Sequence, residues 1–208
     1  TNAEVPSIVE AAITKRGGIP TWAACLSSGA TDLTFMDHNL STAQAAFRAV
    51  LKLMNTTELV LTVPSTDGWN WPGRLEHHHS PSRAHILLDG AHNAQALTAL
   101  ADAMKNDEGF RGRRTLVLYS CVNSREPAKL IPLLRAITEN IFFAPSTVDR
   151  SLTRQDFESM SSARNVFDSV EMGLEALVKS ANAQDLIVVT GSLFAVADAK
   201  AWLTGEPR

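Results

Sequence analysis

Cysteine is scarce in this chain of 208 residues, and its 2 cysteines form no recognisable pattern. Cys25 and Cys121 lie far apart in the sequence, which excludes a disulfide framework and a zinc-binding spacing. Cys121 ends an apolar run, so we expect it to be a small core residue rather than a nucleophile. This cysteine usage fits a reducing compartment.

Long apolar runs and an excess of positive charge are also missing. No stretch approaches 18 consecutive apolar residues, so no membrane span is expected. The first residues lack the positive start and apolar block of a secretory signal. The net charge of -3 provides no basic field that would attract nucleic acid or an anionic membrane. The densest basic cluster, RGRR at 111–114, predicts a solvated turn.

Signature motifs of several enzyme classes are absent as well. The chain has no GxxxxGK[ST] phosphate loop, no GxSxG, no HExxH and no GxGxxG. The run His77-His78-His79 invites a metal site, but consecutive side chains of a strand point to opposite faces, so only His77 and His79 can share one. No acid or cysteine cluster completes a zinc ligand set. We therefore expect no metal site here.

From about residue 67 onward, the chain shows alternating strand and helix patterns. Short apolar runs predict strands, and amphipathic stretches predict helices. The strands are expected at 74–79, 85–88, 115–121, 140–144, 166–169 and 185–190, and the helices at 94–105, 127–137, 153–161, 171–181 and 193–203. This alternation predicts an α/β fold, a mostly parallel Rossmann-like sheet with helices on both faces.

Residues 1–66 give weaker signals and form a separate region. Helices are expected at 7–15 and 42–54 and a short strand at 58–63. The turn-rich stretch PSTDGWNWPG then marks a boundary near residue 66. The chain is thus expected to have two parts, 1–66 and 67–208.

Two strand-to-helix joints carry candidate functional residues. In LDGAHN, at 88–93, Asp89 suits helix capping, but His92 has no structural need to be there. Thr190-Gly191-Ser192 is a second joint, where Ser192 suits a cap. If the two strands are neighbours, both joints open at the sheet edge where α/β proteins bind ligands.

An arginine after a rigid turn adds a third candidate. Arg74 follows Trp71-Pro72-Gly73. Such an arginine is usually a surface charge, but at a cleft its guanidinium suits a phosphate group.

The order WPGR, LLDGAHN and TGSLF resembles the carboxy-terminal domain of folylpolyglutamate synthases and dihydrofolate synthases, which belong to the Mur ligase family of ATP-dependent amide-forming enzymes. The resemblance covers roughly residues 70–205 and extends weakly back to about residue 35. It implies a Rossmann-like ligase domain that closes over a central ATPase domain and helps to bind the incoming L-glutamate. Residues 1–66 would then be the tail of that central domain.

The resemblance also implies roles for the candidate residues. Arg74 and Asp89 would contact the nucleotide, His92 would be a catalytic residue between nucleotide and glutamate, and Ser192 would lie near the glutamate. In this family ATP and Mg²⁺ activate a folate or dihydropteroate carboxylate as an acyl phosphate, which the amine of L-glutamate attacks. The phosphate loop and metal-binding residues of the central domain are missing here. We therefore expect a carboxy-terminal part that is inactive alone.

Two alternatives remain open from the sequence. The chain could be a standalone, non-catalytic binding or interaction domain that kept the ligase fold, or part of a Mur ligase that acts on cell-wall precursors. Within the leading interpretation, dihydrofolate synthase and folylpolyglutamate synthase activities are not separable. We expect a monomer in the cytoplasm (or the mitochondrion of a eukaryote) that binds neither nucleic acid nor membrane.

Overall fold

A computed structural model describes residues 11, 13–17, 35–55, 71–80, 84–123, 126–160 and 165–205, with only the backbone of 35–38. The chain divides into two compact units, Thr1–Gly68 and Trp69–Arg208. Each unit is described by itself.

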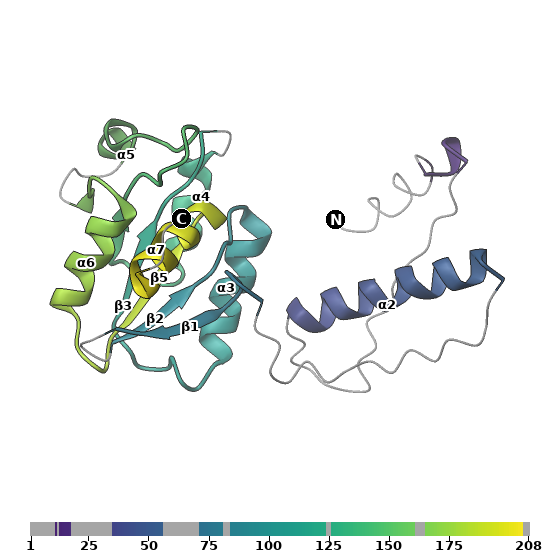
Figure 1. Ribbon diagram of the computed structural model, residues 1–208, viewed down its shortest axis with the longest axis horizontal. Coiled ribbons are helices and arrows are strands. Elements are labelled where there is room, and N and C mark those ends of the chain that lie inside the picture. The colour runs from purple at the N-terminus through teal and green to yellow at the C-terminus, as the bar shows by residue number, and fades with distance from the viewer. Residues whose placement is uncertain are drawn as a thin grey trace. The chain divides into compact units, whose positions relative to one another are not determined.

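The second unit is built on a five-stranded sheet with the order β1-β2-β5-β3-β4 (Figure 1). Its strands are β1 (Glu76–His79), β2 (His85–Leu88), β3 (Thr115–Tyr119), β4 (Ile141–Phe143) and β5 (Leu186–Thr190). β1 pairs antiparallel with β2, and the other three pairings are parallel. This arrangement confirms the predicted α/β fold with a mostly parallel sheet.

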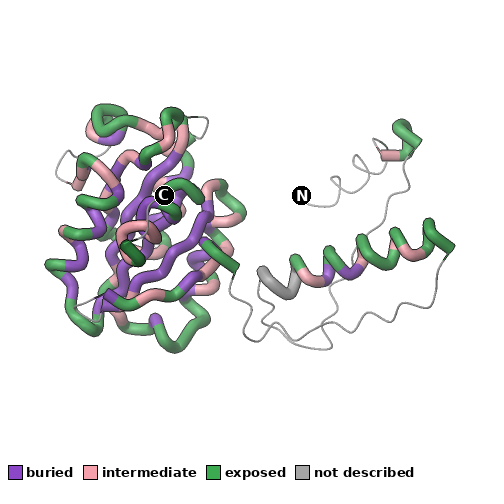
Figure 2. Tube along the Cα trace, in the orientation of Figure 1, coloured by how far each residue is buried: buried purple, intermediate pink, exposed green. Residues whose placement is uncertain are grey.

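Helices cover both faces of the sheet, so β2, β3, β4 and β5 are largely buried on each side (Figure 2), whereas the edge strand β1 exposes His77 and His79. The helices of this unit are α3 (Ala94–Asn106), α4 (Pro127–Arg135), α5 (Arg154–Met160), α6 (Val170–Ser180) and α7 (Leu193–Thr204). Leu87 and Val188 pack in the cluster that includes α3, α4 and α5. Their neighbours Leu88 and Val189 pack in the cluster that includes α6 and α7. Double burial explains why these strands are apolar without alternation.

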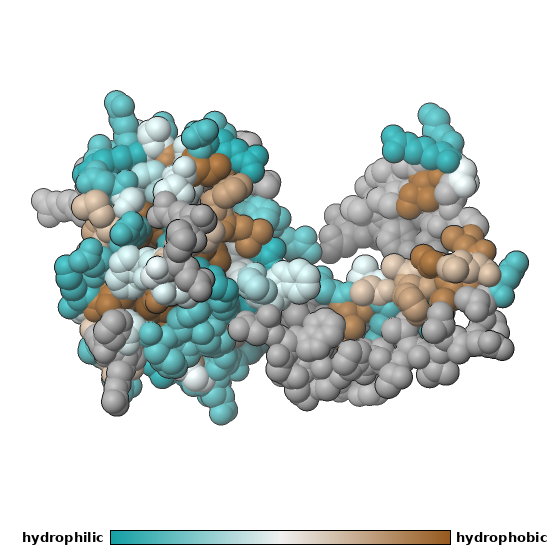
Figure 3. Space-filling view, viewed as in Figure 1, coloured by the Kyte–Doolittle hydropathy of each residue, from teal (hydrophilic) through white to brown (hydrophobic). Residues whose placement is uncertain are grey.

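In the first unit, the main described element is α2 (Phe35–Leu53), which begins ahead of the helix predicted at 42–54. Phe47, Val50 and Leu53 are exposed on it, and Figure 3 shows apolar side chains gathered there. Of the helix predicted at 7–15, residues 11 and 13–15 are described, and they are helical. The strand predicted at 58–63 lies outside the described residues. No helix among the described residues has the length and apolar character needed to cross a membrane.

Two predicted strands differ from the structure. The strand predicted at 74–79 begins only at Glu76, because Gly73 and Leu75 have φ values of 71° and 45°, which strands do not allow. The strand predicted at 166–169 is reduced to a single bridge between Phe143 and Val166. The chain turns away there because Ser169 caps α6 through its side chain.

Candidate functional site

The two predicted joints lie side by side at one edge of the sheet. β2 and β5 are adjacent and parallel, with Leu88 opposite Val189. Immediately beyond them, the Ala91 carbonyl oxygen accepts hydrogen bonds from Gly191 N at 2.9 Å and from Thr190 Oγ1 at 3.3 Å. The prediction that both loops open on the same edge is therefore confirmed.

Asp89 ties two backbone segments together and does not cap a helix. One carboxylate oxygen accepts from Ala91 N at 2.8 Å, and the other accepts from Leu75 N at 3.0 Å. The cap of α3 is Asn93, whose side chain accepts from Ala96 N at 2.8 Å. The capping interpretation of Asp89 is therefore wrong, because the acid is four residues too early.

The environment of Asp89 is electrostatically unusual. Burial raises the pKa of this carboxyl above its ordinary value, and this effect outweighs the backbone hydrogen bonds and the nearby Arg74 and His92, which lower it. The residue is only 5% exposed. Because the carboxyl is shielded from bulk solvent, the charges of its neighbours act on it with little screening.

Arg74 lies over the glycine of the first joint. A Cβ added at Gly90 would lie 2.8 Å from Arg74 Nη1, so the glycine makes room for the guanidinium. That nitrogen donates to Gly73 O at 3.3 Å. Among the described residues, no carboxylate lies within ion-pair distance of Arg74. Its other donors remain available for an anionic ligand.

His92 is half-buried and has one ring nitrogen fixed. Its Nδ1 lies 2.8 Å from Gly90 O. A carbonyl oxygen only accepts, so Nδ1 carries the hydrogen, and in the neutral ring Nε2 is the acceptor. The ring is thus held in one tautomer, with Nε2 able to receive a hydrogen bond or a proton.

Ser192 caps α7, as its position in the sequence suggested. Its Oγ accepts from Ala195 N at 3.0 Å, and the residue is 5% exposed. The preceding Gly191 has a φ of 104°, and a Cβ there would overlap the Ser120 carbonyl oxygen. The hydroxyl hydrogen of Ser192 can still be donated, because capping uses only the oxygen as an acceptor.

Sequence reasoning missed the loop that follows β4. Arg150 O accepts from Asn123 N at 2.9 Å, which joins this loop to the one after β3. The Arg150 guanidinium carbon lies 5.1 Å from the centre of the Phe194 ring, in a cation–π contact. Phe194 ends the TGSLF stretch, but Arg150 belongs to no motif, so only the fold reveals that the two residues meet at this edge.

His77, His79 and His85 form a cluster on β1 and β2, and Cys121 follows β3. His77 Nδ1 lies 2.8 Å from His85 Nε2, but no group of three or more His, Cys, Asp or Glu in the described part of the chain could hold a metal ion. Burial and the neighbouring His77 and His79 lower the pKa of His85 to about 4. Cys121 is fully buried, and burial raises its pKa to about 11, so the thiol is a poor nucleophile.

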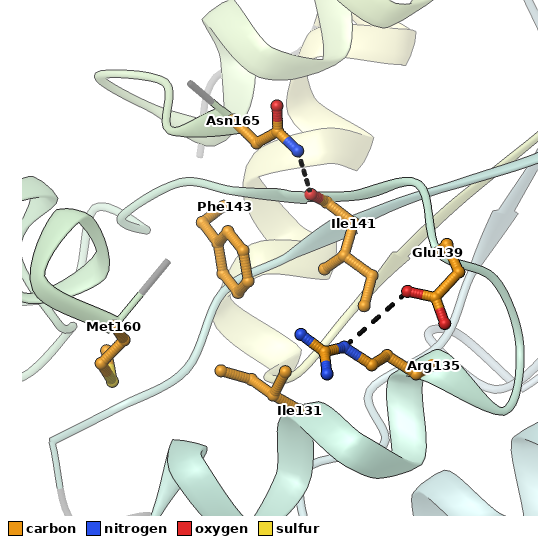
Figure 4. Close-up of a pocket in the computed structure, with 7 residues that line it drawn as sticks. All are labelled: Ile131, Arg135, Glu139, Ile141, Phe143, Met160 and Asn165. Atoms are coloured by element: carbon orange, nitrogen blue, oxygen red, sulfur yellow. Dashed lines mark hydrogen bonds and ion pairs between the residues drawn. The ribbon is translucent and has the colours of Figure 1, made fainter. Parts of the chain in front are cut away.

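A pocket of about 180 Å³ beside β4 also lies apart from the predicted residues (Figure 4). Arg135 pairs with Glu139 at its rim, and Asn165 donates to the Ile141 carbonyl. Its remaining lining residues are apolar: Ile131, Ile141, Phe143 and Met160. None of Arg74, Asp89, His92 or Ser192 contributes to it.

The parallel sheet and its loops define a Rossmann-like domain with a candidate ligand site at the carboxyl ends of the strands. Residues 73–193 match the family described as Mur ligase, glutamate ligase domain, and the chain belongs to this family.

Several curated proteins are similar in sequence. The chain is 29% identical over 132 residues to a dihydrofolate synthase/folylpolyglutamate synthase of Bacillus subtilis. It is 26% identical over 126 residues to the protein of the same name from Escherichia coli. These matches cover 62% and 61% of this chain, but only 29% of each relative. The chain thus spans less than a third of the length of these relatives.

Solved structures share the fold. E. coli FolC in complex with DHPP and ADP superposes with a TM-score of 0.66 at 24% identity, over 80% of this chain and 39% of FolC. A bifunctional folylpolyglutamate synthase/dihydrofolate synthase with Mn, AMPPNP and L-glutamate bound gives the same TM-score at 18% identity, over 86% of this chain and 42% of that protein.

Proposed function

We propose that this chain is the carboxy-terminal part of an ATP-dependent folate–glutamate ligase. In the complete protein it would join L-glutamate to the carboxylate of a folate or a dihydropteroate through an acyl phosphate. The observation that carries this proposal is that Asp89, His92 and Ser192 lie on two adjacent loops, with Arg74 over the glycine of the first, in a chain of the glutamate ligase domain family.

The residues present fit a nucleotide phosphate. Arg74 has donors that no described acid occupies, and Gly90 leaves space for its guanidinium. ATP supplies the phosphoryl group that activates the carboxylate. Arg74 would hold phosphate oxygens and offset their charge. Asp89 would act on this side of the site by fixing the Leu75 and Ala91 backbone, and its charge would orient Arg74.

His92 and Ser192 would serve the amine side of the reaction. The fixed tautomer of His92 leaves Nε2 as an acceptor, which suits an ammonium group that must lose a proton before it attacks. Ser192 can donate its hydroxyl hydrogen to a carboxylate of the glutamate. His92 is thus the proposed catalytic residue, and Ser192 a substrate-binding one.

Mg²⁺ belongs to another part of the complete protein in this proposal. The described residues contain no cluster that could hold it. The chain would therefore contribute the arginine, and the central ATPase domain would contribute the metal ligands and the phosphate loop. Domain closure would bring the two sets together and exclude water.

The test is a phosphate-release assay on the protein encoded by the complete reading frame of this chain. We expect release that requires ATP, L-glutamate and a pteroyl substrate together. Dihydropteroate and tetrahydrofolate, tested separately, distinguish the two synthase activities. The 208-residue chain by itself should show no release above background. Turnover by the isolated chain would contradict the division of labour proposed here.

Two other results would replace the proposal. Turnover with a cell-wall peptide precursor in place of the pteroyl substrate would indicate a Mur ligase of cell-wall synthesis. A complete reading frame without a phosphate loop, and with no ATP-dependent turnover, would indicate a non-catalytic binding domain.

A further inference from the structure

The loop after β4 is anchored on both of its sides. Val122 and Ser151 form an antiparallel bridge that links it to the loop after β3. On the other side, Thr147 donates from its backbone N and from its Oγ1 to the buried carboxylate of Asp198 on α7, at 2.8 and 2.7 Å. Such anchors fix the backbone of Arg150, which lies between Thr147 and Ser151.

The Arg150 side chain is positioned but not paired. Its guanidinium lies over the ring of Phe194, which fixes the direction of the side chain. Arg150 is exposed, and no described carboxylate lies within ion-pair distance of it. Arg114 and Arg154, by contrast, each form an ion pair with an aspartate. Arg150 therefore presents the planar group that best matches a carboxylate, with its donors unused.

Two buried hydroxyl groups accompany Arg150 at this edge. Ser120 follows β3 and is fully buried, while Ser146 lies in the Arg150 loop and is 7% exposed. In the described part of the chain, neither Oγ has a hydrogen-bond partner. Buried hydroxyls are rarely left unsatisfied, so their presence in the loops around Arg150 points to a polar ligand or to water held there.

Arg74 and Arg150 each lie near one of the first two residues of α7, the helix that Figure 1 shows in front of the sheet. Leu193 approaches Gly73 and Gly90, beside Arg74, whereas the next residue, Phe194, lies under Arg150. The sheet order separates the two arginines, because Arg74 lies beside β1 and β2 at one edge and Arg150 follows β4 at the other. Two separate cations would complement the two anions of such a ligase reaction, a polyphosphate and an amino-acid dicarboxylate.

We infer that Arg150 binds a carboxylate of the incoming L-glutamate, with Phe194 as its positioning residue, while Arg74 serves the nucleotide. This inference rests on the proposed function, and it names the group that selects an acidic amino acid at the same site. Arg150 would then determine specificity, because a neutral amino acid would leave its charge unmatched.

The experiment measures steady-state kinetics of the complete protein and of its Arg150→Gln variant, with each of the three substrates varied in turn. We expect the KM for L-glutamate to rise about 10- to 100-fold, the loss typical of a charged hydrogen bond. The KM values for ATP and the pteroyl substrate should stay within about twofold, because Arg150 touches neither. Arg150→Lys keeps the charge but loses the planar contact, so it should recover only part of the loss.

Phe194→Leu and Arg154→Gln serve as the matched variants. Phe194→Leu leaves Arg150 in place but removes its ring contact, so it should raise the KM for L-glutamate by a smaller factor than Arg150→Gln does. Arg154→Gln removes the same charge four residues away, from a side chain already paired with Glu158 and Asp168, and should leave that KM unchanged. Melting temperatures of all variants show whether each is folded.

The outcomes separate this inference from the proposed function. Glutamate-dependent turnover of the wild type, with an unchanged KM for L-glutamate in a folded Arg150→Gln variant, overturns the inference alone. A rise in the KM for ATP or for the pteroyl substrate instead also overturns it, since Arg150 would then serve another anion. A wild type without glutamate-dependent turnover overturns both.

Discussion

The joint after β2 and the joint after β5 follow one plan, but their loops are held by different forces. Each ends a buried parallel strand, passes through a glycine and begins a helix capped by a polar side chain, Asn93 or Ser192. The β2 joint depends on the buried charge of Asp89. The β5 joint depends on the close backbone approach of Gly191 to Ser120. Electrostatics shape the first joint and steric fit shapes the second, so different substitutions should break them.

Gly191→Ala should have the largest effect on stability. The new methyl group would overlap the Ser120 carbonyl oxygen, and a φ of 104° strains any residue with a Cβ. Backbone strain and overpacking each cost about 1–3 kcal/mol, so we expect a loss of about 4 kcal/mol in the free energy of unfolding. Urea denaturation followed by circular dichroism measures it.

Gly90→Ala is the matched control in the other joint. Its methyl group would meet the side chains of Leu193 and Arg74, which can move, and Gly90 does not have a positive φ. We expect a smaller loss, about 1–2 kcal/mol. Equal losses in the two variants would show that the joints do not differ in the way proposed.

Asp89→Ala should have the next largest effect, because it leaves the Leu75 and Ala91 N–H groups without their acceptor. Each unsatisfied buried donor costs about 1–3 kcal/mol, and relief of the buried charge offsets part of this, so we expect a loss of about 2–3 kcal/mol. Thermal and urea unfolding of the 208-residue chain measure it.

Asp89→Asn should also lose stability, since its amide group would present a donor to one of the same two N–H groups. A loss of activity after substitution of Asp89 therefore cannot be assigned to nucleotide binding, because the same substitution lowers stability. Arg74→Gln separates them better, because Arg74 contributes only a 3.3 Å bond to Gly73 O. Full stability in Asp89→Ala would show that the acid is not a structural tie.

His85 should make stability depend on pH from the opposite end of β2. Its pKa is lowered from 6.5 to about 4 by burial, then by His77, His79 and Arg113. The neutral ring is therefore favoured by folding. This contribution is complete above pH 6.5 and is lost as the pH falls from 6.5 towards 4. After a discount for partial exposure, we expect a loss of about 1–2 kcal/mol.

The measurement is urea denaturation at pH 7, 5.5 and 4.5 for the wild type and for His85→Gln. The variant should lose less stability over this range, while His79→Gln should change the profile less than His85→Gln does, because burial, the largest cause of the lowered pKa of His85, stays in place. Parallel pH profiles for His85→Gln and the wild type would mean that His85 does not titrate abnormally.

Ser192→Ala should have the smallest effect on folding. It removes the side chain that accepts from Ala195 N, a loss that costs about 1 kcal/mol for a typical cap. If Ser192 also binds glutamate, as proposed, the variant of the complete protein should raise the KM for L-glutamate while its melting temperature falls only slightly. A change in stability without any change in that KM would assign Ser192 to capping alone.

Most of the fold followed from the sequence because its strands are short apolar runs with clear breaks. The buried run from His85 to Leu88 was predicted with its observed limits, since Asp89 and Gly90 end it. The prediction of a strand at 166–169 was wrong because apolar residues do not reveal how many residues of two strands pair, and here only one pair forms. The predicted start of the first strand at residue 74 was wrong because Leu75 has a left-handed backbone, and a left-handed leucine has no signature in the sequence.

Only part of the candidate site could be predicted from the sequence. Arg74, Asp89, His92 and Ser192 stand in recognisable local patterns, and the structure places the last three on adjacent loops, with Arg74 over the glycine of the first. Arg150 was not visible, because its contact with Phe194 depends on the sheet order and on a bridge between two loops. The hydrogen bond that Asp89 accepts from Leu75 N could not be predicted from the sequence either, because the β1–β2 hairpin separates the two residues along the chain.

The central place of β5 has a consequence for how the domain forms. β5 is the last strand of the sheet in chain order, yet it lies between β2 and β3. While the protein is being synthesised, β2 and β3 must wait with unpaired edges until Leu186–Thr190 leaves the ribosome. Such late, long-range pairing slows folding and exposes edges that can aggregate. The joint after β5, which carries Ser192, therefore takes its place only after all the other strands of the sheet have been synthesised.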